Sequence, residues 1–248
     1  MTGSVPNATD FTAEDARIRA AYARRVDAER YSWFNDAHML AVQERERQTL
    51  ALLREHGVRS LETARVLDVG CGVGFWLREM VKWGAQPHQL TGVDLLPDRL
   101  AEAERRCPPG VTLVCGNAAA VEVPRESFDI VLQSMLFTSV LDAELRQAVA
   151  RKMLDAVRPD GLILWYDYHV SNPRNRDVRG VSRAEIRALF PGCRIELRRV
   201  TLAAPLARVV ARSHAVHSLL HAVPFLRTHY LGVIRKRLDP SSLQASKP

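Results

Sequence analysis

The chain has 248 residues, 47% of them hydrophobic and 25% charged, which is typical of one large globular domain with a sizeable core. No apolar run reaches the roughly 18 residues of a transmembrane helix, and the first residues lack the charged start and apolar block of a secretory signal. The net charge is +7, but the arginines that supply most of it are spread along the chain, which favours a solvated surface over a nucleic-acid site.

The four cysteines show no CxxC spacing. We therefore expect free thiols in a reduced, cytoplasmic setting rather than a disulfide framework. We also expect a monomer or a homodimer that holds no metal ion.

The N-terminal part is predicted to be helical after a disordered lead of residues 1–10. Over residues 11–60, apolar residues recur three and four positions apart among charged ones, and Gly57 is a fitting helix stop. Between two such stretches lies RYSWFNDAHM, which is dense in aromatic side chains. We expect residues 11–60 to form a helical cap over the rest of the molecule.

From Arg65 onward, short strand-like runs alternate with helical ones. This alternation indicates α/β architecture: βαβ units and a mostly parallel, Rossmann-like sheet with helices on both faces. The predicted strands are residues 65–69, 90–95, 111–115, 128–133, 162–168, 194–202 and 230–234. The predicted helices are residues 74–83, 98–107 and 142–157, one that Ser182 and Glu185 begin with a capping box, and 203–226, a helical insert before the last strand. Residues 158–161 (RPDG) are predicted as a turn.

The join between the first strand and its helix is rich in glycine. Gly70, Gly72 and Gly74 alternate after Asp68, and glycines there let backbone amides approach a ligand at the positive end of a helix. The dinucleotide pattern G-x-G-x-x-G would need a glycine where Phe75 stands. The neighbouring strand ends must therefore indicate the ligand.

Those strand ends suit a nucleoside. Asp94 ends the second strand, where a carboxylate can accept hydrogen bonds from both ribose hydroxyls. Leu95 can lie against a flat base, and Asn117 can accept from an exocyclic amine and donate to a ring nitrogen. Local roles remain alternatives: Asp68 as a brace of the loop, Asp94 as a helix cap and Asn117 as a turn former.

With these residues the sequence resembles the class I S-adenosylmethionine-dependent methyltransferases. VLDVGCGVG is similar to their first motif and TGVDLLPDRLAEA to their second, while FDIVLQSMLFTSV and MLDAVRPDGLILWYDY match their fourth and fifth strand regions. The resemblance covers residues 61–168 and continues more loosely to the end. It implies a seven-stranded sheet with an antiparallel last strand, and a cofactor-binding core of residues 61–248.

The same resemblance implies S-adenosylmethionine as the cofactor and S-adenosylhomocysteine as its product. The glycine loop would hold the methionine part, with Asp68 near its amino group. Asp94 would bind the ribose, and the residues after the third strand would bind the adenine. The end of the fourth strand would line the floor of the site near the methyl group. The residues implied to bind the cofactor are Asp68, Gly70, Cys71, Gly72, Gly74, Asp94, Leu95, Asn117, Ala118, Gln133 and Ser134.

A hydroxyl acceptor profits from a base that removes its proton. Alternation along the fifth strand places Asp167 and His169 on one side, where the carboxylate would raise the basicity of the imidazole. A surface histidine beside a salt-bridged aspartate is the alternative, and His38 is the next candidate base. The residues predicted to contact the acceptor are Tyr31, Trp33, Phe34, Phe137, Tyr168, His214 and His217.

Other motifs limit the acceptor. Gln133 and Ser134 replace the acidic ligands of a metal-assisted catechol enzyme, and no D/N-P-P-Y/F motif of amino-directed DNA methylases follows the fourth strand. One helical face carries His214, His217 and His221, which could line a pocket, bind a metal or face solvent. A phosphate or carboxylate of the acceptor could meet Arg174, Arg176 and Arg179, although a solvated loop is the equal alternative.

We therefore expect a metal-independent methyltransferase for a small-molecule acceptor, with O-methylation favoured, in a glycan, lipid-linked or natural-product pathway. One alternative is an RNA methyltransferase, whose binding to RNA would be lost steeply with salt. Another is a protein that binds S-adenosylmethionine without transferring its methyl group. The basic, amphipathic insert 203–226 also allows peripheral membrane contact, with packing on the sheet edge as the alternative.

Overall fold

The computed structural model describes residues 11–24, 32–173, 175–210 and 222–237, together with residues 213, 216, 219 and 220. Several predictions fall outside the described residues: those for the lead of residues 1–10 and for Tyr31, Arg174, His214, His217 and His221.

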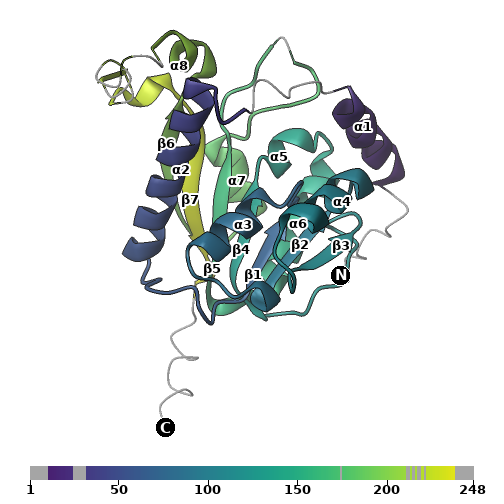
Figure 1. Ribbon diagram of the computed structural model, residues 1–248. Helices are drawn as coiled ribbons and strands as arrows, with labels where there is room; N and C mark the ends of the chain where they lie inside the picture. Colours follow the sequence, from purple (N-terminus) through teal and green to yellow (C-terminus); the bar gives the residue numbers. More distant parts are fainter. Residues whose placement is uncertain are drawn as a thin grey trace.

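A seven-stranded sheet in the order β3-β2-β1-β4-β5-β7-β6 forms the centre of the molecule (Figure 1). The strands β1 to β5 run parallel, and β7 runs antiparallel to both β5 and β6. The predicted Rossmann-like sheet with an antiparallel last strand is therefore confirmed. The strands are β1 (Val66–Val69), β2 (Leu90–Asp94), β3 (Thr112–Cys115), β4 (Phe128–Ser134), β5 (Val157–Tyr168), β6 (Arg194–Leu202) and β7 (Arg227–Arg235).

Helices cover both faces of this sheet, because buried parallel strands must be shielded from water on both sides. Leu52, Trp76 and Leu77 lie in the core under α2 to α4, and Phe137, Val149 and Ile186 lie in the core under α5 to α7. The helices are α1 (Thr12–Ala23), α2 (Asp36–Glu55), α3 (Phe75–Lys82), α4 (Pro97–Arg106), α5 (Leu136–Ser139), α6 (Ala143–Ala156), α7 (Arg183–Leu189) and α8 (Ala204–Val210), with 3-10 turns η2 (Pro87–Gln89) and η3 (Pro224–Leu226).

The two N-terminal helices lie in different places. In Figure 1, α2 runs along β6 and β7, which it contacts, while α1 lies at the other side of the molecule near α4. The side chain of Glu14 on α1 accepts hydrogen bonds from the backbone amides of Leu141 and Asp142, and Arg17 donates to the Ser139 carbonyl. These polar contacts add to the apolar packing of α1, whose Ile18 and Ala21 are buried.

Three elements differ from the sequence prediction. The short helix α5 was not predicted, and it begins after Met135, whose φ of 63° is left-handed. Strand β5 begins at Val157, so the predicted turn 158–161 is an irregularity within the strand, between the pairs Phe128–Val157 and Ile130–Leu162. The predicted helix 203–226 is helical at Ala204–Val210, with a 3-10 turn at Pro224–Leu226, and several residues between lie outside the described part.

Strand order positions the site. The neighbours of β1 are β2 and β4, so the chain crosses to one side of β1 and then to the other. Ligands of open α/β sheets bind at the carboxyl ends of the strands where this reversal occurs. Val69, the last residue of β1, is paired with Val93 of β2 and Gln133 of β4, which brings the predicted cofactor residues of three strands to one edge.

Candidate active site

The glycine loop has the backbone that its sequence demands. Gly70, Gly72 and Gly74 have φ values of 77°, 55° and 72°, in the left-handed region that favours glycine. A Cβ at Gly70 would lie 3.0 Å from Leu136 Cδ1, and a Cβ at Gly74 would lie 2.5 Å from Cys107 Sγ. Side chains are therefore excluded from the loop on both steric and conformational grounds, and α3 starts directly after it.

Asp68 is a buried carboxyl group with unmet hydrogen bonding. Its side chain lies on β1 and is 1% exposed, and neither oxygen has a hydrogen-bond partner in the described structure. Burial raises the pKa of Asp68 to about 8, and the charge of nearby Asp94 adds to the rise. Asp68 does not brace the loop through hydrogen bonds. A carboxyl group in this state fits a ligand that brings a positive charge or N–H donors to this edge of the sheet.

Asp94 organises the loop from the end of β2. One carboxylate oxygen accepts from the Gly72 amide at 2.8 Å, and the other accepts from the Leu96 amide at 2.9 Å. Burial raises the pKa of Asp94, while these backbone hydrogen bonds oppose the rise. Each oxygen keeps a second lone pair. The group can therefore brace the loop and still accept from ribose hydroxyls, so both readings of Asp94 are compatible.

The third strand end is in contact with α1. The Asn117 amide nitrogen donates to Asp15 of α1 at 2.6 Å, and its oxygen accepts from the Ala119 backbone amide at 2.9 Å. The second bond is the local turn that was the alternative for Asn117. Leu95 and Ala118 pack half-buried against the neighbouring core. The side-chain nitrogen of Asn117, which was predicted to donate to a ring nitrogen of adenine, thus donates to Asp15.

The fourth strand ends in a tight turn. Gln133 is fully buried, and its side-chain oxygen accepts from the Leu136 amide at 3.2 Å, which fixes the start of α5. Ser134 is half-buried next to the left-handed Met135. Cys71 is buried, and burial raises the pKa of its thiol far above the usual range, so it remains a neutral thiol.

Asp167 and His169 do not form the predicted pair. The Asp167 carboxylate accepts from the backbone amide and the hydroxyl of Thr138 and from the Tyr168 amide, so it caps α5. Burial raises its pKa to about 6. The His169 ring bonds the Arg227 carbonyl through Nε2 at 2.9 Å and stacks on Tyr230. Because side chains alternate along a strand, those of Asp167 and His169 lie on the same side, but each is held by a different partner.

The environment of His169 sets its tautomer. A carbonyl can only accept, so Nε2 carries the proton and Nδ1 is the basic atom of the neutral ring. The pKa of His169 is lowered, chiefly by burial, so the carboxylate-raised basicity expected from the sequence is not present. The ring is neutral at pH 7 and keeps one nitrogen able to take a proton. His169 therefore remains a candidate base without an aspartate partner.

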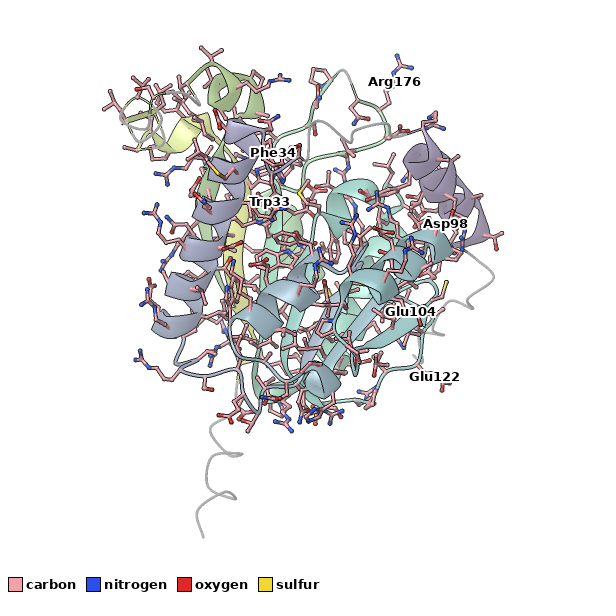
Figure 2. The ribbon with its side chains drawn as sticks, in the orientation of Figure 1. Trp33, Phe34, Asp98, Glu104, Glu122 and Arg176 are labelled. Carbon is pink, nitrogen blue, oxygen red and sulfur yellow. The ribbon has the colours of Figure 1, made fainter. Side chains whose placement is uncertain are left out.

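The predicted acceptor residues fall into three environments. Phe137 is buried and packs against Trp165 at 4.8 Å, so it belongs to the core. Trp33 and Phe34 are exposed at the beginning of α2, where Figure 2 labels them. Tyr168 is half-buried, with its ring centroid 3.9 Å from that of a histidine not predicted from the sequence, His229.

Two further histidines, His229 and His38, lie near Arg45. His229 on β7 stacks between Tyr166 and Tyr168, and burial lowers its pKa to about 3. His38 on α2 contacts the Trp33 ring edge-on, and burial lowers its pKa as well. The charge of Arg45, one helical face along from His38, contributes to both shifts. His38 and Arg45 are seven residues apart, which places them on one face of a helix. This spacing was the signal in the sequence that could have identified Arg45.

The predicted arginine loop divides. Arg179 pairs with Glu185 at 2.7 Å, and Arg176 is exposed and points away from the body of the molecule in Figure 2. Within the described residues, no three His, Cys, Asp or Glu side chains are grouped so that they could hold a metal ion. No described helix combines the length and apolarity needed to cross a bilayer.

Comparison with known proteins agrees with this geometry. A family described as "Methyltransferase domain" matches residues 66–161, which run from β1 into β5. Among curated proteins, the ubiquinone biosynthesis O-methyltransferase of Rhizobium etli is 35% identical over 108 residues, covering 42% of this chain and 41% of that protein. The tRNA N(3)-cytidine methyltransferase METTL2 of Gallus gallus is 29% identical over 112 residues, covering 42% of this chain and 30% of that protein.

The curated relatives match over less than half of their length. The 2-methyl-6-phytyl-1,4-hydroquinone methyltransferase of Synechocystis is 30% identical over 112 residues, covering 44% of this chain and 33% of that protein. These matches share the cofactor-binding half of the fold and differ in the acceptors that their names state.

Solved structures resemble a larger part of the chain. The Burkholderia thailandensis 1,6-didemethyltoxoflavin-N1-methyltransferase, solved with S-adenosylhomocysteine, has a TM-score of 0.61 at 18% identity and covers 96% of this chain and 94% of that one. An S-adenosylmethionine-dependent methyltransferase of Mesorhizobium loti has a TM-score of 0.55 at 19% identity, covering 74% and 95%. At this identity the likeness establishes the fold.

The motifs, the strand order and the orphaned Asp68 carboxyl beside the glycine loop all agree with the matched family. S-adenosylmethionine, which supplies an electrophilic methyl group when bound, fits the donors and the open loop at this strand edge. Residues 66–161 of the chain match the methyltransferase-domain family, and the chain has the seven-stranded fold of the class I S-adenosylmethionine-dependent methyltransferases.

Proposed function

We propose that the protein transfers a methyl group from S-adenosylmethionine to a hydroxyl of a small, lipid-linked acceptor, without a metal ion. The observation that carries the methyl-donor part is the set of groups at the carboxyl ends of β1 and β2. A buried carboxyl without partners, three left-handed glycines and a loop-bracing Asp94 meet at one strand edge. This arrangement suits an ammonium group, a backbone-bound tail and a ribose.

The protein's contribution to transfer is alignment, dehydration and removal of a proton. Methyl transfer is an in-line displacement, so the acceptor oxygen must lie behind the methyl carbon in a site closed to water. We place this oxygen beyond the carboxyl ends of β4 and β5. The hydroxyl proton would pass to Nδ1 of His169, the unprotonated nitrogen of a neutral ring, with His38 as the alternative base.

A lipid-linked acceptor is supported by two observations. The names of two relatives refer to a phytyl hydroquinone and to ubiquinone biosynthesis. In addition, residues 197–238 contain eight Lys or Arg and no Asp or Glu, and the exposed side chains of Val209, Leu219 and Phe225 lie in this stretch. Arg208 on α8 lies beside the exposed Val209, and a basic side chain next to exposed apolar ones supports an acceptor presented at an anionic membrane.

Two other functions have specific support. The tRNA methyltransferase relatives and the net charge of +7 support an RNA acceptor. A fold neighbour whose name states a [4+2]-cyclase, SpnF, has a TM-score of 0.57 over 94% of this chain at 16% identity, so this fold also occurs in a protein named for another reaction.

A transfer assay separates these functions. The protein is incubated with S-adenosylmethionine labelled in its methyl group and with prenylated hydroxybenzenes, matched methyl ethers of the same compounds, or tRNA. We expect label in the organic phase from the free phenols, none from the ethers and no change on adding a chelator. Label in tRNA would support the RNA alternative, and no label from any acceptor despite cofactor binding would support a function without methyl transfer.

A further inference from the structure

Arg45 occupies an unusual place for a cation. It lies on α2, and its guanidinium carbon is 4.6 Å from the Phe75 ring centroid, 5.1 Å from that of Trp76 and 5.2 Å from that of Tyr166. Faces of aromatic rings attract cations at these distances. Three elements, α2, α3 and β5, thus converge on one positive charge.

The aromatic rings hold this charge without neutralising it. The Arg45 Nε is buried and has no hydrogen-bond partner, and the Nε1 of neighbouring Trp76 is in the same state. The ion pairs found among the described residues do not include Arg45, but the preceding residue, Glu44, is buried, and its charge acts on Tyr166 as that of Arg45 does. A buried N–H of a cation that lacks an acceptor is costly, so the unmet Nε of Arg45 is complementary to an anion.

Arg45 lies beside the residues that follow the glycine loop. Phe75 and Trp76 are the first two residues of α3 and follow Gly74 of the glycine loop directly. On the other side, the Tyr166 ring stacks on His229, and the Arg45 charge acts on His229 and on His38. The guanidinium therefore lies between the loop and the strand ends of β5 and β7.

We propose that Arg45 is the anion receptor of this site and binds a carboxylate. A planar carboxylate matches the forked N–H edge of a guanidinium and can bond it in a bidentate manner while rings cover the faces. The inference deepens the proposed function. The carboxylate has two sources, the methionine part of the cofactor or an acid group on the acceptor, and both bring the same chemistry to Arg45.

The test uses ligand pairs that differ in the carboxylate alone. The first pair is S-adenosylhomocysteine and its decarboxylated analogue, and the second is 4-hydroxybenzoate and 4-hydroxybenzamide, titrated in the presence of the decarboxylated nucleoside. Calorimetry measures each Kd for the wild type, Arg45→Gln and Arg45→Lys, with the exposed Arg47→Gln on the same helix as the matched control. Thermal unfolding verifies that each variant is folded, and Arg45→Lys keeps the cation if Arg45→Gln does not fold.

We expect Arg45→Gln to raise the Kd of a carboxylated ligand about tenfold or more and to change that of its uncharged partner less than about twofold. Arg45→Lys should lie between, because it keeps the charge and loses the fork. An effect within the first pair assigns Arg45 to the cofactor, and an effect within the second assigns it to the acceptor.

Equal changes for both members of each pair, or no change at all, would overturn the inference and leave Arg45 as a packing residue. In that case tight binding of S-adenosylhomocysteine by the wild type would leave the proposed function intact. A wild type that bound neither pair would contradict the inference and the proposed function together.

Discussion

The buried carboxyl groups near the strand ends differ in the number of hydrogen bonds that they accept from the protein. This difference indicates which of them is available to a ligand. Asp94 and Asp167 accept bonds from backbone amides, so part of their role is local. Asp68 is equally buried and accepts none. A buried, unpartnered carboxyl group is rare in folded proteins, so Asp68 is the residue whose protonation should report ligand binding most clearly.

Cofactor binding should release a proton from Asp68. With a pKa of about 8, the carboxyl is mostly protonated at pH 7 in the cofactor-free protein. An ammonium group placed against it favours the charged form. The affinity for S-adenosylhomocysteine should therefore rise with pH between 6 and 8, by up to roughly tenfold per unit. Asp68→Asn should flatten this slope, and the exposed Glu104→Gln should leave it unchanged.

Calorimetry in buffers of different ionisation enthalpy measures this proton directly. The same raised pKa means that the folded, cofactor-free chain holds a proton that the unfolded chain loses above its ordinary value of 3.8. The free energy of unfolding of the cofactor-free protein should thus decrease as the pH rises from 3.8 through about 8. Equal proton release by the wild type and Asp68→Asn would contradict the role given to Asp68.

His169→Ala should lower turnover about tenfold to a hundredfold while changing the Kd for S-adenosylmethionine less than about twofold. Its pKa is lowered, so the basic form persists below pH 6.5, and the wild-type rate should fall only when the pH drops through the lowered value. The exposed His88→Ala is the control. A variant rate equal to that of the wild type would transfer the role of base to His38 or remove it.

Among the helices and strands, the sequence predicts the ones that are specified by residues close together in the chain. The strands β2, β4 and β6 and the Ser182 capping box agree with prediction because alternation and capping depend on neighbouring residues. The helix α5 does not follow from local pattern. Its start needs Met135 in a left-handed conformation, and its cap is the Asp167 carboxylate from another strand. Tertiary contacts therefore decide this element.

The site divides in the same way. The glycine loop and Asp94 were predictable because each follows a strand at a fixed offset. The contact between Asp15 and Asn117 was not, because it joins residues 102 positions apart. Arg45 and His229 were missed because their meaning depends on rings from α3 and β5 that only the fold brings to them.

Glu14 should decide how firmly α1 is held. It pairs with Arg17 and accepts from the Leu141 and Asp142 amides, and such charge-assisted bonds contribute about 1–3 kcal/mol. Glu14→Ala should speed amide exchange in α1 while the sheet strands keep their protection, and the exposed Arg19→Ala should do neither.

The pKa of Glu14 is lowered, because hydrogen bonds to Arg17 and to the backbone outweigh burial. The contribution of Glu14 to stability is therefore present at neutral pH. It is lost as the pH falls below 4.5 through the lowered pKa of this carboxyl group. Exchange in α1 that ignored both the substitution and acid pH would show that apolar contacts of α1 hold it instead.

The whole molecule has an uneven surface. Residues 197–238 lack acidic side chains, and Trp33, Phe34 and Phe225 are 55%, 97% and 76% exposed. The beginning of α2, where Trp33 and Phe34 lie, is near α8, which α2 contacts (Figures 1 and 2). Arg208 lies on α8 at the end with the exposed apolar side chains, whereas Arg198 pairs with Glu55 and Lys236 donates to the Val157 carbonyl at the opposite end.

The end with the exposed apolar side chains should bind anionic vesicles. Flotation with phosphatidylcholine vesicles that contain phosphatidylglycerol should recover several times more protein than flotation with phosphatidylcholine alone, and high salt should reduce the excess. Phe34→Ser combined with Phe225→Ser should weaken binding without changing the Kd for S-adenosylhomocysteine. Equal recovery on both vesicle types would contradict membrane contact, and salt-sensitive binding to tRNA alone would favour the RNA alternative.

The central claim is that neighbouring strand ends bind one S-adenosyl ligand, and calorimetric titration of S-adenosylhomocysteine into the wild type and Asp94→Ala tests it most directly. We predict saturable one-to-one binding by the wild type and a Kd at least about tenfold higher for Asp94→Ala, because the ribose loses its acceptor and the Gly72 amide its brace. No binding by the wild type, or the same Kd for both proteins, would contradict the account.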